Sequence, residues 1–408
     1  MKKIIWIFSA AALALAVSAC DADTGIMDGR GKYSYDAADG YGAMAPGEGS
    51  SSDPSGSGDG QGGNSEAGKV TAGEWNDLDK WDFWGDLMLN ENFAEYSDYW
   101  KFYTNNRFAF TVYAPDGKPA PGVKVSLFRG GTELWSALTC NDGRADCWAG
   151  LFQKENIEDA SAFYVKINGK ESDKKPVMST WEQGMVMNTY SVTSAPKTTA
   201  SADIAFIVDA TGSMMDEIDF LKDDLLDILK KAEASQSDVK YRTAALFYRD
   251  EGDEYVTKYS NFSAKATDTS KFIEKQRADG GGDYPEAVHT ALEVSLQSLS
   301  WSEDARARIA FMLLDAPAHH NADVIASLQK SIAKYAARGI RLIPVAASGV
   351  DKNTEFMLRF FSAATCGTYV FITNHSGIGN DHIEATVGDY EVESLNELIA
   401  RLIVKYTK

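Results

Sequence analysis

The chain has 408 residues, enough for two or three compact domains, and its hydrophobic content of 44% is that of a globular protein. These values exclude a chain that is disordered throughout. The net charge is −19, from 40 Lys and Arg against 59 Asp and Glu. Because so acidic a chain repels phosphate backbones, we expect no nucleic-acid partner, and cations fit its charge better.

Residues 1–19 are predicted to form a signal peptide for export. Lys2 and Lys3 precede an apolar run that is too short to span a bilayer stably, and small residues then lead directly into Cys20. The stretch resembles a bacterial lipoprotein signal, which implies cleavage before Cys20 and lipidation of its side chain. We therefore expect an exported protein held on a bacterial membrane by its lipid, with the outer membrane or cell surface favoured. A plain secretory signal is the alternative.

Two segments with opposite compositions follow. Residues 20–73 are rich in Gly, Ser and Asp and have no apolar period, so we expect a disordered tether. Residues 74–106 are crowded with aromatic side chains. Such side chains usually pack against a neighbouring domain, and we expect an aromatic-rich packing segment here. Glycan binding by an exposed aromatic cluster is the alternative.

Residues 107–195 are predicted to form a small β-sandwich, because short alternating stretches such as RFAFTVYA are separated by turn residues. The D-G-x-P-x-P-G-V-x-V pattern from Asp116 to Val125 resembles the carboxypeptidase-regulatory or transthyretin-like sandwiches of surface proteins. Cys140 and Cys147 flank an Asp-Gly turn, and we predict a disulfide between them, which an exported protein permits. Two unpaired thiols are the alternative.

Residues 203–408 carry solid apolar strands that alternate with amphipathic helices. This pattern predicts an α/β fold with a doubly wound, mostly parallel sheet and helices on both faces. In such sheets ligands bind beyond the carboxyl ends of the strands. The functional site should therefore lie just after the strands.

Side chains with carboxylate or hydroxyl oxygens occur directly after the predicted strands. The first strand ends at Asp209, and Thr211 and Ser213 follow at alternate positions. A later apolar strand ends at Asp315, and the Gly-rich loop between them contains Asp283. Carboxylate and hydroxyl oxygens suit a hard divalent cation, so the sequence predicts a Mg²⁺ or Ca²⁺ site.

With these residues, the sequence from Asp203 to the C-terminus resembles the von Willebrand factor type A domain. In that family a D-x-S/T-x-S loop, a Thr from a second loop and an Asp from a third form a metal-ion-dependent adhesion site. The resemblance implies that Asp209, Thr211 and Ser213 bind the ion, with Asp315 next to it through water. The implied function is metal-dependent binding of a protein partner, which contributes an acidic side chain.

Asp283 is a departure from that pattern, because it stands where many members have the Thr. The surrounding GGGDxPE sequence is similar to a subgroup that includes hemicentin-like domains. A third carboxylate should hold the ion more tightly and attract an acidic partner less strongly.

Four histidines beyond strand ends suggest a second site, and with Asp381 they could bind a transition metal; ordinary loop histidines are the alternative. These residues are His319, His320, His375 and His382.

A metal-dependent hydrolase using the Asp209 cation, with His319 or His320 as general base, is a rival function. The sequence contains no G-x-S-x-G, H-E-x-x-H or phosphate-cradling G-x-x-x-x-G-K motif, and we expect a binding module without catalytic activity.

Overall fold

The computed structural model describes residues 70–157, 159–374 and 384–408. All of them lie within one unit, residues 63–408. The predicted signal peptide, Cys20, nearly all of the predicted tether, His375 and His382 lie outside the described residues. Within the described ranges no helix is long and apolar enough to cross a membrane.

A mixed sheet of eight strands organises the C-terminal half, in the order β11-β10-β9-β12-β13-β14-β1-β15. The strands from β10 to β14 run parallel, and β11 (Thr257–Ser263) pairs antiparallel with β10 at one edge. The predicted mostly parallel sheet is therefore confirmed. Its parallel strands are β9 (Thr199–Asp209), β10 (Lys240–Tyr248), β12 (Ala305–Leu314), β13 (Ile340–Ala346) and β14 (Tyr369–Ile372).

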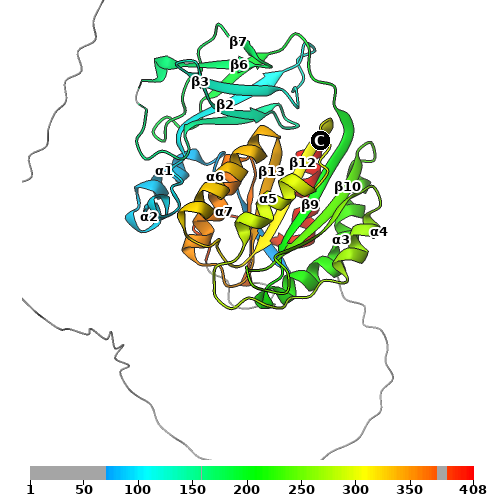
Figure 1. Cartoon of the computed structure of the whole chain (residues 1–408). Coiled ribbons are helices and arrows are strands. Elements are labelled where there is room, and N and C mark those ends of the chain that lie inside the picture. The colour runs from blue at the N-terminus through cyan, green and yellow to red at the C-terminus, as the bar shows by residue number, and fades with distance from the viewer. Residues whose placement is uncertain (1–69, 158, 375–383) are drawn as a thin grey trace, which may run out of the picture. The chain divides into compact units, whose positions relative to one another are not determined.

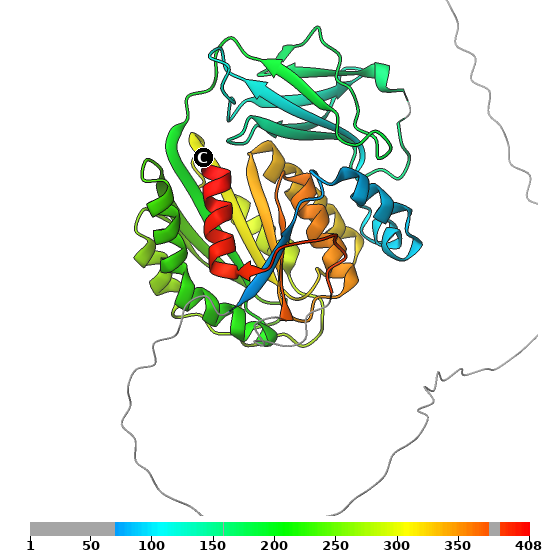
Figure 2. The same ribbon diagram turned by 180° about the vertical axis from the view of Figure 1, so that it is seen from behind.

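Helices cover both faces of this sheet (Figures 1 and 2). Along β9, Ala205 and Ile207 face one layer, whereas Ile204, Phe206 and Val208 face the other. Burial on both faces explains why the strands are continuously apolar. The first layer is α5 (Val288–Ser298), α6 (Ala322–Ala337) and α7 (Lys352–Ala364), and the second is α3 (Met215–Ser235), α4 (Ala266–Ile273) and α8 (Leu395–Thr407).

The sheet also contains a strand from far upstream. β1 (Thr71–Trp75) pairs antiparallel with β14 and, at its beginning, with β15 (Glu393–Ser394). The sequence predicts that residues 71–75 belong partly to the tether and partly to the aromatic-rich packing segment. The structure differs because these residues complete the α/β sheet, so the predicted boundary at residue 203 leaves out one strand.

The aromatic-rich segment packs as core. It forms α1 (Trp81–Leu89) and α2 (Glu91–Trp100), which lie against α7. Phe102 stacks on Phe360 with 4.1 Å between ring centroids. Because its large rings are buried, the segment does not have the exposed aromatic cluster that the glycan-binding alternative requires. The buried rings are Trp75, Trp81, Trp84, Phe93, Trp100 and Phe102.

Between β1 and β9 the chain forms the predicted β-sandwich from two sheets, ordered β5-β2-β8 and β4-β3-β6-β7. Phe108 from one sheet and Phe163 from the other meet in its core, with ring centroids 5.1 Å apart. The strands are β2 (Asn105–Tyr113), β3 (Lys124–Arg129), β4 (Thr132–Leu138), β5 (Arg144–Gly150), β6 (Phe163–Ile167), β7 (Lys170–Glu171) and β8 (Met187–Ser191).

The structure does not form the predicted disulfide between Cys140 and Cys147, and the strand geometry argues against this pairing. The Cys140 amide donates to the Arg144 carbonyl oxygen at 2.8 Å, so Cys140 lies opposite the start of β5. Cys147 is three residues further along that strand, a separation of about 10 Å that a disulfide does not span. Its thiol is buried in the sandwich, 3.8 Å from the Val125 carbonyl oxygen.

Candidate functional site

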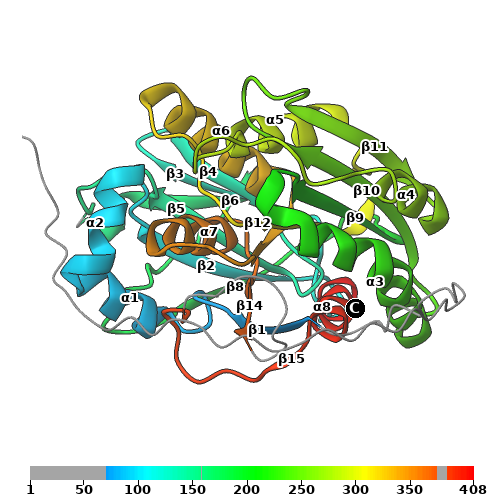
Figure 3. The ribbon, with the colours of Figure 1, turned by 90° about the horizontal axis from the view of Figure 1, so that it is seen from below.

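Strand register brings the predicted ligands to one edge of the sheet. Asp209, the last residue of β9, pairs with Tyr248, the last residue of β10. On the other side Val208 pairs with Leu313 of β12, so Asp315 comes directly after the strand beside Asp209. Figure 3 looks along the strands of this sheet. The fold therefore brings Asp209 and Asp315 to the same carboxyl edge of the sheet, as predicted.

Asp209 organises the loop that follows it. Its Oδ1 accepts hydrogen bonds from the Thr211 amide at 2.9 Å and the Thr211 hydroxyl at 2.7 Å. These bonds turn the chain into the 3₁₀ turn η2 (Gly212–Met214), which leads into α3. Oδ2 of Asp209 is buried and has no hydrogen bond of ordinary geometry among the described residues, although the nearby Tyr248 hydroxyl partly opposes the rise of the pKa of Asp209. One carboxylate oxygen is thus used to shape the loop, and the other is left available.

Like Asp209, Asp315 is buried, interacts with a hydroxyl of the loop after β9 and has one unpartnered carboxylate oxygen. A hydrogen bond from the Ser213 hydroxyl partly opposes the effect of burial, which raises the pKa of Asp315. Its Oδ1 is buried and unpartnered within the described residues. Burial and the charge of Asp315 raise the pKa of Asp209 to about 7. Asp315 thus disfavours the ionised form of Asp209, and either a proton or a nearby cation would relieve this repulsion.

In the Gly-rich loop Glu286 is buried near Asp209, whereas the predicted ligand Asp283 is exposed. Asp283 is exposed and has no hydrogen-bond or ion-pair partner among the described residues, so the structure does not place it with Asp209. Glu286 is buried, and its Oε2 is unpartnered. Burial and the charge of Asp209 raise its pKa to about 9. Sequence reasoning missed Glu286, although its place after Pro285 at the end of the same loop was a signal.

Backbone contacts fix the loop in this position. The Glu286 amide donates to the Pro317 carbonyl oxygen at 2.9 Å, just beyond Asp315. Gly281 has a φ of +73°, and a Cβ there would lie 3.2 Å from Glu286 Oε1 and 3.3 Å from Thr211 Cβ. Glycine is needed at this position because the loop passes close to the Asp209 turn in a left-handed conformation. The close passage brings Glu286 toward Thr211.

The donor set fits a hard divalent cation. Asp209, Glu286 and Asp315 each have a buried carboxylate oxygen without a protein partner, and the hydroxyls of Thr211 and Ser213 accompany them. Such oxygens are the ligands of Mg²⁺ and Ca²⁺. In the described part of the chain no group of three or more His, Cys, Asp or Glu side chains is close enough to hold an ion by itself. An ion here would therefore need the hydroxyls and water as well.

The two described histidines of the predicted second site point to other partners. His319 Nε2 lies 2.6 Å from Asp250 Oδ1. His320 stacks on Tyr99 with ring centroids 3.6 Å apart, and its Nε2 is 2.8 Å from the Tyr99 carbonyl oxygen. Each ring is thus engaged in a separate local contact, and His375 and His382 lie outside the described residues.

Known proteins resemble this chain chiefly in its C-terminal half. Residues 203–373 match the family model of the von Willebrand factor A domain. An ariadne-like RING finger protein of Acanthamoeba polyphaga mimivirus is 34% identical over 124 residues, which are 30% of this chain and 12% of that protein. The alpha-protein kinase vwkA of Dictyostelium discoideum is 29% identical over 119 residues, 29% of this chain and 19% of the kinase. The matches span less than a fifth of either relative.

Among solved structures, BatB of Bacteroides thetaiotaomicron, a conserved hypothetical protein, has 13% sequence identity and a TM-score of 0.35, over 50% of this chain and 98% of its own. The family match covers the strands from β9 to β14 and every residue of the acidic edge described above. The chain therefore contains a von Willebrand factor A domain, formed around residues 203–373.

Proposed function

We propose that the protein is a binding module without catalytic activity, in which the von Willebrand factor A domain holds Mg²⁺ or Ca²⁺ and engages another protein through that ion. The domain type is a general protein-interaction module. The observation that carries the proposal is the pair of buried, unpartnered oxygens on Asp209 and Asp315 at one strand edge. Leaving such oxygens without a positive partner is costly, and a bound cation removes that cost.

Asp209, Thr211, Ser213 and Asp315 are the residues that would hold the ion. The ion would supply positive charge that attracts an acidic side chain of the partner protein. Glu286, rather than Asp283, would add a third carboxyl group beside it.

Exposed apolar side chains near the edge suit a protein partner. Met215 follows the Ser213 turn and is 57% exposed, and Tyr284 precedes Glu286 and is 44% exposed. The Tyr284 hydroxyl accepts from the Asp351 amide at 3.2 Å, which holds the ring in place. Ordered apolar side chains around a charged centre are a common composition of binding surfaces.

We further propose that the protein is exported and anchored by lipid at Cys20 to a bacterial membrane, the outer membrane or the cell surface. This part rests on the N-terminal sequence, which lies outside the described residues. A lipid anchor and a protein-binding domain together would hold a partner near that membrane.

Calorimetric titration of the full-length protein with Mg²⁺ and with Ca²⁺ tests the ion site. Asp209→Ala should abolish binding, because it removes the carboxylate that also shapes the loop. Asp219→Ala on α3 is the matched control, since Asp219 is an exposed carboxylate that pairs with Lys222 at 2.8 Å. Equal metal binding by the wild type and Asp209→Ala would contradict the proposal.

Partner capture from native membranes, with and without EDTA, tests whether the protein binds a partner through the ion. A partner that is lost with EDTA and lost in Asp209→Ala supports adhesion through the ion. A hydrolysis panel of phosphoesters and peptides tests the absence of catalysis. Turnover that disappears in Asp209→Ala would instead support a metal-dependent hydrolase.

A further inference from the structure

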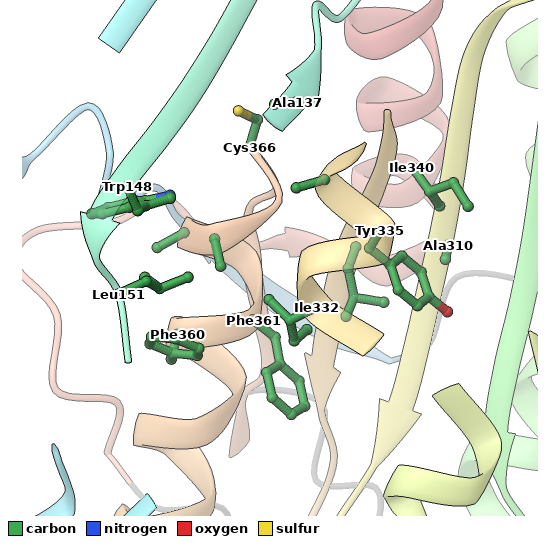
Figure 4. Close-up of a cluster of buried hydrophobic side chains, with 14 of the residues drawn as sticks. Ala137, Trp148, Leu151, Ala310, Ile332, Tyr335, Ile340, Phe360, Phe361 and Cys366 are labelled. Atoms are coloured by element: carbon green, nitrogen blue, oxygen red, sulfur yellow. The ribbon is translucent and has the colours of Figure 1, made fainter. Parts of the chain in front are cut away.

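Two cysteine thiols from different domains meet where the sandwich contacts the α/β domain. Cys140 comes two residues after β4, and Cys366 lies between α7 and β14. Both cysteines lie at the start of β5: the Cys140 amide pairs with the Arg144 carbonyl oxygen, and the Cys366 thiol lies beside Asp146, two residues further along. A side-chain hydrogen bond between the two thiols is the largest influence on the pKa of each. In Figure 4 Cys366 lies next to the strand that carries Ala137, three residues before Cys140.

Surrounding contacts hold both cysteines in place. Cys366 Sγ lies 3.5 Å from Asp146 Oδ2 of β5, and its carbonyl oxygen accepts from the buried guanidinium of Arg341. Next to Cys140, the Asn141 side chain donates to the Lys405 carbonyl oxygen at 3.1 Å. Cys140 and Arg341 line the same small space between the domains. Several contacts between the sandwich and the α/β domain therefore hold the two cysteines next to each other.

We propose that Cys140 and Cys366 form a disulfide that joins the sandwich to the von Willebrand factor A domain. The oxidant is the disulfide of a thiol oxidoreductase or of oxidised glutathione. The Cys140 thiolate attacks one of its sulfurs and releases the other as a thiol. Cys366 then loses its proton and attacks Cys140, which releases the second thiol. Two protein thiols are oxidised and one external disulfide is reduced to two thiols.

The local charges favour this order of attack. The hydrogen bond from Cys366 lowers the pKa of Cys140, and the positive charge of Arg341 acts in the same direction. The same hydrogen bond and burial raise the pKa of Cys366. Cys140 is also the less buried of the two residues, so it is the one that an external disulfide reaches first. The thiolate that reacts first is thus the accessible one.

Cys147 provides a natural control. Its thiol is fully buried in the sandwich, and burial raises its pKa well above the ordinary value. A thiol with little thiolate character and no access to the oxidant reacts slowly. We expect Cys147 to stay reduced while Cys140 and Cys366 are oxidised.

Mass spectrometry of the full-length protein tests the pairing directly. The protein is purified without reductant, its free thiols are alkylated under denaturing conditions, and it is digested with trypsin. Cleavage after Arg144 places Cys140 and Cys147 on different peptides. The expected result is a reductant-sensitive link between the peptides that contain Cys140 and Cys366, with Cys147 alkylated. If Cys140 and Cys366 are both alkylated even after incubation with oxidised glutathione, the proposal is wrong.

Thermal unfolding gives a second readout. Reductant should lower the unfolding temperature of the wild type by about 5 °C or more, since the bond closes a chain loop of more than two hundred residues. Cys140→Ser and Cys366→Ser should both lose this response, whereas Cys147→Ala should keep it. Cys140→Ser keeps the test valid if Cys366→Ser does not fold. A reductant response that persists in Cys140→Ser would overturn the proposal. These readouts do not depend on metal binding.

Discussion

Asp77, just beyond β1, and Arg359, within α7, form an ion pair in which both side chains are fully buried. The Arg359 Nε atom lies 3.0 Å from Asp77 Oδ2, and Nη2 donates to Oδ1, so the pairing is bidentate. The two residues are 282 positions apart in the sequence. The pair makes the segment before the sandwich an integral part of the α/β core.

Asp77→Ala should lower the free energy of unfolding by about 3 kcal/mol, because the buried Arg359 charge loses its bidentate partner and keeps only the longer ion pair with Glu355 at 3.6 Å. Urea unfolding of the full-length protein is the measurement. Lys118→Ala is the matched control: it removes an ion pair with Asp116 in which both side chains are more than half exposed, and it should cost less than about 1 kcal/mol. Equal losses in the two variants would show that the buried pair has no special role.

A fragment of residues 203–408 should be far less stable than one of residues 70–408. The shorter fragment lacks β1, so the amide and carbonyl groups of β14 along one edge lose their partners, and it also lacks Asp77. Circular dichroism and urea unfolding of the two fragments test this. Identical midpoints would mean that β1 is dispensable, as the sequence-based boundary implied.

The metal-free protein should lose stability as pH rises from about 5 to 9. The pKa of Asp209 is raised from 3.8 to about 7 and that of Glu286 from 4.5 to about 9, so the folded state binds these protons more tightly than the unfolded chain. This contribution is fully present below the ordinary pKa values and disappears as pH rises through the raised ones.

Saturating Mg²⁺ or Ca²⁺ should reverse that loss, because the ion binds the ionised carboxylates. The measurement is the urea midpoint at pH 5, 7 and 9, in EDTA and in metal. Asp209→Asn should flatten the fall over the range from pH 4 to 7. If the variant and the wild type fall equally, titration of Asp209 is not the cause.

Glu286→Gln should weaken divalent-cation binding by about tenfold, because it removes a carboxyl group beside the ion. Asp283→Thr should change the affinity by less than about twofold, since that side chain is exposed and unpartnered in the described structure. Calorimetric titration of both variants separates the two assignments. A larger loss in Asp283→Thr would restore Asp283 as the third carboxylate.

The strand ends were predictable because parallel strands are recognisable from sequence and their carboxyl ends meet at one edge. Asp209 and Asp315 follow such strands directly, so no knowledge of loop conformation was needed. Glu286 was not predictable in the same way. Its position depends on a glycine in a left-handed conformation and on the hydrogen bond to Pro317, neither of which a residue pattern specifies.

Two other features depend on distant contacts. β1 is a five-residue strand, TAGEW, that follows a low-complexity segment, and only its pairing with β14 makes it part of the sheet. Cys140 and Cys147 are close in sequence, but β4 and β5 belong to different sheets of the sandwich. Sequence proximity therefore does not bring these two thiols together.

The direction of β1 determines how mechanical force would travel through the protein. β1 runs antiparallel to β14, with Ala72 opposite Ile372, so the chain reaches the sheet at the carboxyl end of the parallel strands, the end that carries Asp209 and Asp315. A pull on the residues before Val70, resisted by a partner bound at this edge, would load the α/β sheet and bypass the sandwich. Because both points of load lie at the same end of the strands, the pull would act across β1 and would open its backbone pairs with β14 one at a time, beginning at Ala72 and Ile372.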